Sequence, residues 1–170
     1  MIHEEAKLEQ IKIQKAVFAD LDRIMQIYDI ARNFMAANGN GSQWAGGYPQ
    51  ESLLKEDIAE QQLYIIEQSG DIHGVFAFIV GEDETYSVIE QGQWLSADEY
   101  GTIHRIAGDG EVKGMMQTAV EFCWKEISHL RIDTHENNLV MRHLIEKLGF
   151  RQCGIIHVDD GTPRIAYEKI

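Results

Sequence analysis

The sequence predicts a mixed α/β fold in which helices pack against one sheet. Segments with apolar residues at helical spacing alternate with segments of strand-like alternation, in the order β-α-α-β-β-β-β-α-β-α-β-β. The late strand–helix–strand connections imply that some strands pair in parallel. A chain of 170 residues, 44% apolar and 25% charged, has the size and composition of a single globular domain over residues 1–170.

The first part of the chain predicts one strand and two helices. Residues Ile11–Lys15 alternate between apolar and polar, which is typical of an opening strand. A helix with a continuous apolar stripe is predicted from an Asp20 cap to about Met35. A glycine-dense loop follows over 38–49, and a second helix over 50–60. Loops of this composition often line binding sites, although they can also be plain connectors.

The middle of the chain predicts four strands. Residues 63–68 and 72–80 form a hairpin around a Ser-Gly-Asp turn. Another strand is predicted over 86–90, and the next over 100–107. A strongly amphipathic helix begins near residue 115, after a short loop, and the strand Leu130–Thr134 follows it.

A short helix is predicted next, between an asparagine cap and a glycine stop. Its apolar residues share one face because they recur at i, i+3, i+4 and i+7: Met141, Leu144, Ile145 and Leu148. Asn137 or Asn138 can cap its start through a side-chain oxygen, and Gly149 can take the left-handed conformation that ends it. A hairpin of two strands, 154–158 and 164–169, closes the chain.

Composition excludes several classes of partner. A net charge of −13 argues against nucleic acid, because no basic stripe can offset phosphate charge. The same charge would help to attract a cationic small molecule, or simply serve solubility. No apolar run approaches the roughly 20 residues that span a bilayer, and no secretory signal is visible. Cys123 and Cys153 lie in apolar segments and predict free buried thiols, so we expect a cytoplasmic location.

The loop over 108–114 has features of an anion-binding turn. A helix that begins after a glycine-bearing loop presents free backbone N–H groups and a positive dipole end, which suit a pyrophosphate. Lys113 would add a cation. Many α/β domains have such a loop, so the pattern alone favours an ordinary connection. His157, Asp159 and Asp160 are better explained as part of a hydrated turn than as metal ligands, and no metal is predicted.

Two segments together resemble the GNAT acetyltransferase superfamily. The helix in Asn138–Phe150 ends Glu-Lys-Leu-Gly-Phe, which is similar to the last conserved segment of that family. The cofactor loop of the family reads Gln/Arg-x-x-Gly-x-Gly/Ala, and the run Glu111–Met116 matches it at Gly114. Glu111 stands in place of Gln or Arg, and Met116 in place of the small residue.

The resemblance implies a fold and a co-substrate. The fold would be a mixed sheet of about seven strands with about four helices, in which the central fourth and fifth strands are splayed. Acetyl-CoA would lie in that gap. The residues that the resemblance places around it are Arg105, Ile106, Ala107, Glu111, Val112, Lys113, Gly114, Met115, Met116, Asn138 and Arg142. For Arg142, a solvent-facing position on the helix is an equal alternative.

The implied reaction is direct transfer of an acetyl group to a primary amine of a small molecule or peptide. Because a protonated amine is not a nucleophile, a general base is needed, and the candidates are His104, Glu90 and His135. His135 could equally be a turn residue that bonds to the backbone. The family often has a catalytic tyrosine where this chain has Ile145. The aromatic residues expected to line the acceptor pocket, with core packing as the alternative, are Trp44, Trp94 and Tyr100.

A second class of function stays open. Ile145, Glu111 and Met116 all depart from the family pattern, which favours a non-catalytic domain that binds acyl-CoA or another ligand. Acceptor-dependent release of CoA would separate the two hypotheses. The resemblance also implies a homodimer.

Overall fold

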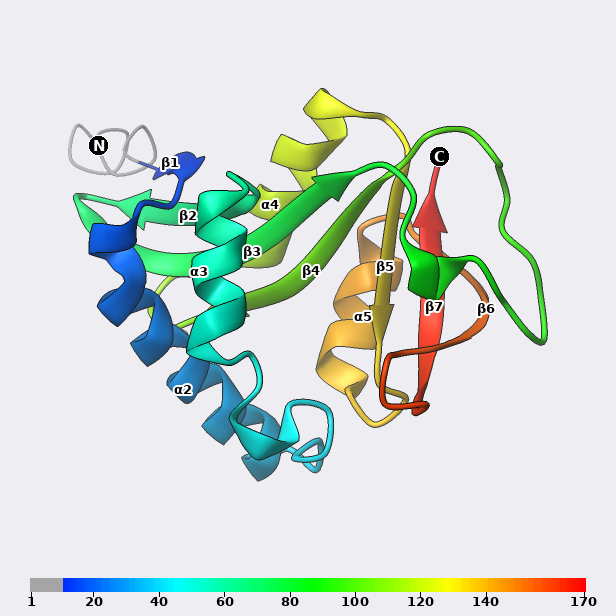
Figure 1. Ribbon diagram of the computed structural model, residues 1–170, viewed down its shortest axis with the longest axis horizontal. Helices are drawn as coiled ribbons and strands as arrows, with labels where there is room; N and C mark the ends of the chain where they lie inside the picture. The colour runs from blue at the N-terminus through cyan, green and yellow to red at the C-terminus, as the bar shows by residue number, and fades with distance from the viewer. Residues whose placement is uncertain (1–10) are drawn as a thin grey trace.

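The computed structural model describes residues 11–170, which form one seven-stranded sheet with helices on both faces (Figure 1). The strands are β1 (Ile11–Lys15), β2 (Leu63–Gln68), β3 (Asp71–Val80), β4 (Gly101–Gly108), β5 (Leu130–Thr134), β6 (Arg151–His157) and β7 (Pro163–Lys169). The helices are α2 (Leu21–Ala37), α3 (Glu51–Ala59), α4 (Met115–Glu126) and α5 (Leu139–Lys147). Short 3₁₀ turns lie at η1 (Phe18–Asp20), η2 (Ala45–Gly47) and η3 (Glu84–Tyr86). Residues 1–10 of the predicted domain lie outside the described part of the chain.

The sheet is mixed, as predicted. Its strand order is β1-β2-β3-β4-β5-β7-β6. Neighbouring strands are antiparallel except β4 and β5, which are parallel and joined through α4. Within residues 11–170, no helix is both long and apolar enough to cross a membrane.

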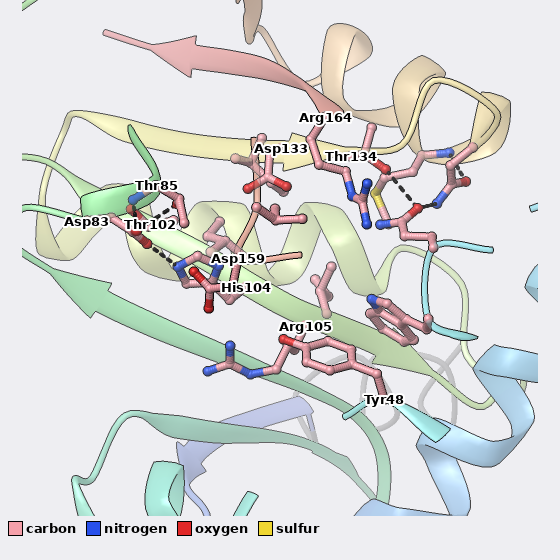
Figure 2. Close-up of a pocket in the computed structure, with 18 of the residues that line it drawn as sticks. Tyr48, Asp83, Thr85, Thr102, His104, Arg105, Asp133, Thr134, Asp159 and Arg164 are labelled. Carbon is pink, nitrogen blue, oxygen red and sulfur yellow. Dashed lines mark hydrogen bonds and ion pairs between the residues drawn. The ribbon is translucent and has the colours of Figure 1, made fainter. Parts of the chain in front are cut away.

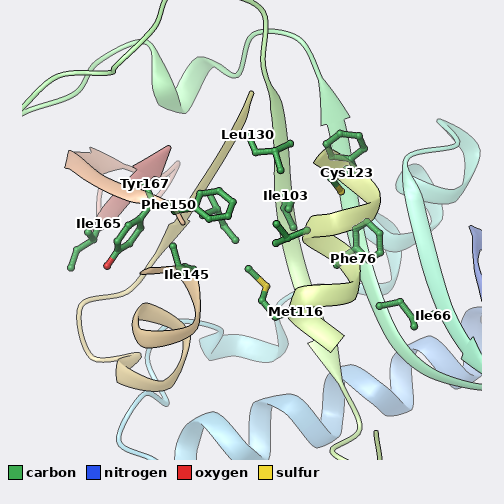
Figure 3. Packing of buried hydrophobic residues seen from close by; sticks show 14 residues of the cluster. Ile66, Phe76, Ile103, Met116, Cys123, Leu130, Ile145, Phe150, Ile165 and Tyr167 are labelled. Atoms are coloured by element: carbon green, nitrogen blue, oxygen red, sulfur yellow. The ribbon is translucent and has the colours of Figure 1, made fainter. Parts of the chain in front are cut away.

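Two apolar layers hold the helices on the sheet. Phe76 and Phe78 of β3 pack in the layer that includes α4 and α5 (Figure 3). Val75 and Ala77 pack in the layer that includes α2 and α3. This division follows from the period of two in a strand, which sends alternate side chains to opposite faces. Each fully buried large side chain contributes roughly 1.5–3 kcal/mol to the stability of folding.

The two central strands separate soon after they meet. β4 and β5 pair only at Gly101 with Leu130 and at Thr102 with Arg131, and they diverge beyond this point (Figure 1). The register between β3 and β4 shifts opposite Phe76, and Arg105 of β4 has a φ of 51°. At this point two residues of β4 lie opposite one residue of β3, which is a β-bulge. A bulge bends its strand and increases the strand's twist. The splayed central strands of the predicted fold are therefore confirmed.

The predicted strand over 86–90 is wrong. The side chain of Asp83 accepts a hydrogen bond from the N–H of Thr85 at 3.0 Å, and this cap starts the turn η3 instead. Glu90 forms only an isolated bridge with Ile155 of β6. The last hairpin is also longer than predicted, because β6 begins at Arg151.

Candidate active site

A cavity of about 770 Å³ opens where β4 and β5 separate (Figure 2). Its walls come from β4 and β5, from the loop between α2 and α3, from the turn after β3 and from the turn between β6 and β7. The predicted site residues that line it are Trp44, His104, Arg105, Ile106 and Asn138. Of the three predicted bases, the structure therefore brings only His104 to this cavity.

His104 is held by a carboxylate that the sequence analysis did not identify. Its Nε2 lies 2.9 Å from Oδ2 of Asp83. Because an ionised carboxylate only accepts hydrogen bonds, Nε2 carries the proton, and Nδ1 can accept one. No partner for Nδ1 is found in residues 11–170. The hydrogen bond from His104 lowers the pKa of Asp83 to about 2, with Thr85 adding to the effect, so this carboxylate stays ionised.

A second carboxylate, Asp133 of β5, faces the same cavity and is held by Tyr86. The Tyr86 hydroxyl donates a hydrogen bond to Oδ2 of Asp133 at 2.6 Å. Burial raises the pKa of Tyr86 well above its ordinary value, and the charge of Asp133 raises it further, so the hydroxyl remains a donor. The Tyr86 ring also stacks on His104, with 6.4 Å between ring centroids. Through Tyr86, the turn η3 therefore contacts His104 of β4 and Asp133 of β5.

The charges around the cavity are of both signs. Its acidic residues are Glu82, Asp83, Glu84, Asp133, Asp159 and Asp160. Two arginines also line it, Arg105 and Arg164. The charge of Arg105 is compensated, because its Nε and Nη2 donate to the two carboxylate oxygens of Asp57 at 3.0 and 2.9 Å. Arg164 extends from β7 into the cavity (Figure 2).

Asn138 joins two parts of the site. Its side-chain oxygen accepts the N–H of Met141 at 3.1 Å, so Asn138 rather than Asn137 is the cap of α5. Its amide nitrogen donates to Oε1 of Gln43 at 3.3 Å, and Asn40 donates to the same oxygen at 2.8 Å. The glycine-dense loop is therefore docked on the start of α5. This contact places Trp44 in the wall of the cavity.

The buried side chain of Asp109 stabilises the predicted cofactor loop. One carboxylate oxygen accepts the N–H of Glu111 at 2.9 Å. The other lies 2.7 Å from both Arg23 and His73. The Asp109 side chain is only 2% exposed, so these contacts hold a buried charge in place. The backbone N–H of Glu111 is consequently engaged within the protein rather than free for a ligand.

The start of α4 still fits an anionic group. Gly114 precedes the helix with a φ of 78°, and the first N–H groups of a helix have no partner within it. Lys113 is exposed beside them. Met116 is 6% exposed and packs in the layer beneath α4 (Figure 3), so its side chain points away from the loop surface. The residues Glu111, Val112, Lys113, Gly114, Met115 and Met116 lie outside the lining of the main cavity.

Other predicted site residues lie away from the cavity. Glu90 is exposed on its bridge to β6. His135 accepts the N–H of Asn137 through Nδ1 at 3.1 Å, which is the turn role left open by the sequence. Arg142 donates through Nε to the hydroxyl of Tyr167 at 3.3 Å. Ala107 is buried in the layer that includes α2 and α3.

Trp94 and Tyr100 surround a buried arginine instead of the cavity. The guanidinium of Arg131 lies 3.9 Å from the Trp94 ring centroid and 3.8 Å from that of Tyr100. Its Nε donates to Glu168 at 2.7 Å, and His129 contacts the same carboxylate at 2.7 Å. These aromatic rings stabilise the segment before β4, and the structure does not bring them to the acceptor pocket.

The sequence carried partial signals for the residues that were missed. Asp133 precedes the end of β5, close to the edge where α/β proteins often bind ligands. Asp83 shows the Asp-x-Thr pattern of a capped turn, but its contact with His104 depends on how β3 returns into β4. Arg164 carries no local signal for a position in a cavity.

The comparisons with known proteins identify the fold. No family model matches the chain, and neither does any curated protein. The structure of a GNAT-family acetyltransferase from Streptococcus agalactiae 2603 is 32% identical, with a TM-score of 0.86 over 94% of this chain and 95% of that chain. A putative acetyltransferase from Staphylococcus aureus Mu50 is 24% identical, with a TM-score of 0.68 over 92% of this chain and 97% of that chain. A GNAT-family acetyltransferase from Listeria monocytogenes 4b F2365 is 18% identical, with a TM-score of 0.69 over 94% of each chain.

A mixed sheet that splits between two parallel strands, with a cavity at the split, defines an acetyltransferase-type domain. Identity of 32% across nearly the whole length of a GNAT structure then decides the family. This chain belongs to the GNAT family of acetyltransferases.

Proposed function

We propose that this protein is an N-acetyltransferase that moves an acetyl group from acetyl-CoA to a primary amine of a small molecule or peptide. The observation that carries this proposal is the pair of His104 and Asp83 in the cavity between β4 and β5. A histidine oriented by a carboxylate is suited to accept a proton near neutral pH.

The chain offers separate groups to each part of acetyl-CoA. The first N–H groups of α4 and the ammonium of Lys113 suit the diphosphate. The backbone of β4 near Arg105 and Ile106, together with Asn138, suits the pantetheine arm. When bound, acetyl-CoA supplies an acetyl thioester to the acceptor. The Gly114 position and the empty space around it are compatible with close approach of a phosphate.

His104 acts as the general base in this proposal. Nδ1 accepts a proton from the acceptor ammonium, and Asp83 stabilises the imidazolium that results. The free amine would then attack the thioester carbonyl, and the C–S bond would break with CoA leaving as the thiolate. The nitrogen would lose its second proton, and this proton would neutralise the thiolate. The position of the usual family acid is occupied by Ile145, whose side chain is fully buried in the core. A thiol with an ordinary pKa of about 8.5 is a fair leaving group without such an acid.

The test measures binding and turnover separately. Calorimetric titration should show acetyl-CoA binding, and a thiol reagent should detect CoA release that depends on an added amine. His104→Gln should lower kcat by about 10²- to 10⁴-fold, the usual contribution of a general base, and leave acetyl-CoA affinity unchanged. His143→Gln is the matched control, because His143 is exposed on α5 and does not line the cavity.

Two outcomes would contradict the proposal. If acetyl-CoA does not bind at millimolar concentration, it is excluded as the acetyl donor. Binding without CoA release across a broad amine panel would instead favour the non-catalytic ligand-binding domain.

We also propose a cellular location and an oligomeric state for the protein. Cys123 and Cys153 are free and buried, and burial raises the pKa of Cys153 to about 11. Protonated, buried thiols suit the reducing cytoplasm, where we place the protein. We also expect a homodimer, which light scattering in solution tests.

A further inference from the structure

Arg164 is a buried cation that faces the cavity without a carboxylate partner. The residue is 8% exposed. Its Nη1 donates to the Thr162 hydroxyl at 3.0 Å and to the Pro163 carbonyl at 2.8 Å. No carboxylate of residues 11–170 lies within ion-pair distance of it, and the exposed Asp160 of the preceding turn interacts with it only from a longer distance. Its Nε and Nη2 have no hydrogen-bond partner among the same residues.

This lack of a close ion pair distinguishes Arg164 from Arg105, which also lines the cavity, and from the buried Arg131. Arg105 is paired with Asp57, and Arg131 with Glu168. A charge that is buried without a partner is costly, because the protein replaces little of the hydration that it loses. The guanidinium extends from β7 into the cavity (Figure 2), so the missing partner belongs on the cavity side.

Several carboxylates line the same cavity as Arg164, and two of them have other hydrogen-bond partners. Asp83 is bonded to His104, and Asp133 to Tyr86, on the side of the proposed base. Asp159 also lines the cavity, from the turn between β6 and β7. A purely cationic acceptor would satisfy these carboxylates but would be repelled by Arg164. A ligand with one charge of each sign would satisfy both.

We propose that the acceptor is a small amino acid-like molecule whose carboxylate binds Nε and Nη2 of Arg164. The planar guanidinium matches a carboxylate through two parallel hydrogen bonds. The amine of the same molecule lies toward His104, among the carboxylates of the cavity. This inference rests on the proposed acetyl transfer and names the class of its acceptor.

The experiment compares amino acids with their amides and their decarboxylated amines as acceptors. Acceptor-dependent CoA release should be at least about tenfold more efficient, in kcat/KM, for the amino acids, as expected for a charge-assisted hydrogen-bond pair. Arg164→Gln should remove this preference, and Arg164→Lys should retain part of it. Arg151→Gln, at an exposed arginine outside the cavity, should leave the preference unchanged. Circular dichroism melting confirms that each variant folds.

The outcomes separate this inference from the proposed function. Equal turnover of amino acids and amides would overturn the inference while acetyl transfer stands. If no amine supports CoA release, the anion site is tested by titrating N-acetylated amino acids and their amides into the wild-type protein. Tighter binding of the carboxylates, lost in Arg164→Gln, supports the site, whereas equal binding overturns it.

Discussion

At the scale of single residues, the cavity depends on side chains that are each oriented by a neighbour. Asp83 orients His104, Tyr86 orients Asp133, and Asn138 both caps α5 and contacts Gln43. A group that is held in one rotamer loses less entropy when a ligand binds. The residue pairs, rather than isolated side chains, therefore define what this cavity can do.

The Asp83 pair has a pH dependence with a definite sign. Its pKa is lowered from 3.8 to about 2 by the hydrogen bond from His104, so its contribution to stability is fully present above pH 3.8. The contribution is lost as the pH falls toward 2. Asp83→Asn should lower the free energy of unfolding by about 2 kcal/mol at pH 6 and by much less near pH 2.

Urea unfolding at several pH values measures this difference. Asp98→Asn is the control, because Asp98 is exposed and its carboxylate has no hydrogen bond or ion pair in the described residues. A stability difference for Asp83→Asn that does not change with pH would argue against the ionised hydrogen bond.

At the scale of elements, turns rather than strands carry most of the site. The turn η3 supplies Tyr86 and follows Asp83, and the start of α4 depends on the left-handed Gly114. The bulge in β4 and the short pairing with β5 open the gap between the strands. A regular ladder would have closed this gap, because paired strands lie only about 4.8 Å apart.

Gly114→Ala tests the role of the α4 start. Gly114 has a φ of 78°, and an added Cβ would meet nothing within 4 Å. The variant should lose about 1 kcal/mol of folding stability, because alanine is strained at this φ. It should also bind acetyl-CoA several-fold more weakly, because the N–H groups at the start of α4 shift. Gly161→Ala in the last hairpin has a similar φ of 83° and the same free space, so it should cost similar stability only.

Thermal melting and acetyl-CoA calorimetry together decide this prediction. Equal loss of acetyl-CoA affinity in both variants, or no loss in Gly114→Ala, would show that this loop does not bind the co-substrate.

At the scale of the whole molecule, the net charge of −13 produces a negative field around the protein. Acetyl-CoA is itself an anion, so the field opposes its approach. A zwitterionic acceptor has no net charge and is little affected. Self-repulsion also destabilises the compact state, and salt screens both effects.

Ionic strength should therefore act differently on the two proposed substrates. Raising NaCl from about 0.02 to 0.3 M shortens the screening length severalfold. The KM of acetyl-CoA should fall, the KM of a zwitterionic acceptor should change little, and the melting temperature should rise by a few degrees. Steady-state kinetics and calorimetry at each concentration measure this, and a rise in the KM of acetyl-CoA would contradict it.

The sequence by itself determined the family resemblance and the order of the helices and strands, apart from the strand expected at 86–90. Other readable features were the bounds of β1, β2 and β5, an asparagine cap at 137 or 138, and the left-handed conformation of Gly149. Periodicity and capping act between residues close in the chain. The strand expected at 86–90 failed where a side-chain cap outweighed β propensity.

Only the tertiary structure decided which distant residues meet. Sheet order, register and the gap between β4 and β5 decide several contacts. These are the hydrogen bond between Asp83 and His104, the enclosure of Arg131 by Trp94 and Tyr100, and the position of Arg164 without an ion pair within residues 11–170. These are contacts between residues far apart in the chain. Their energies come from burial and charge pairing in the folded state, which no local pattern records.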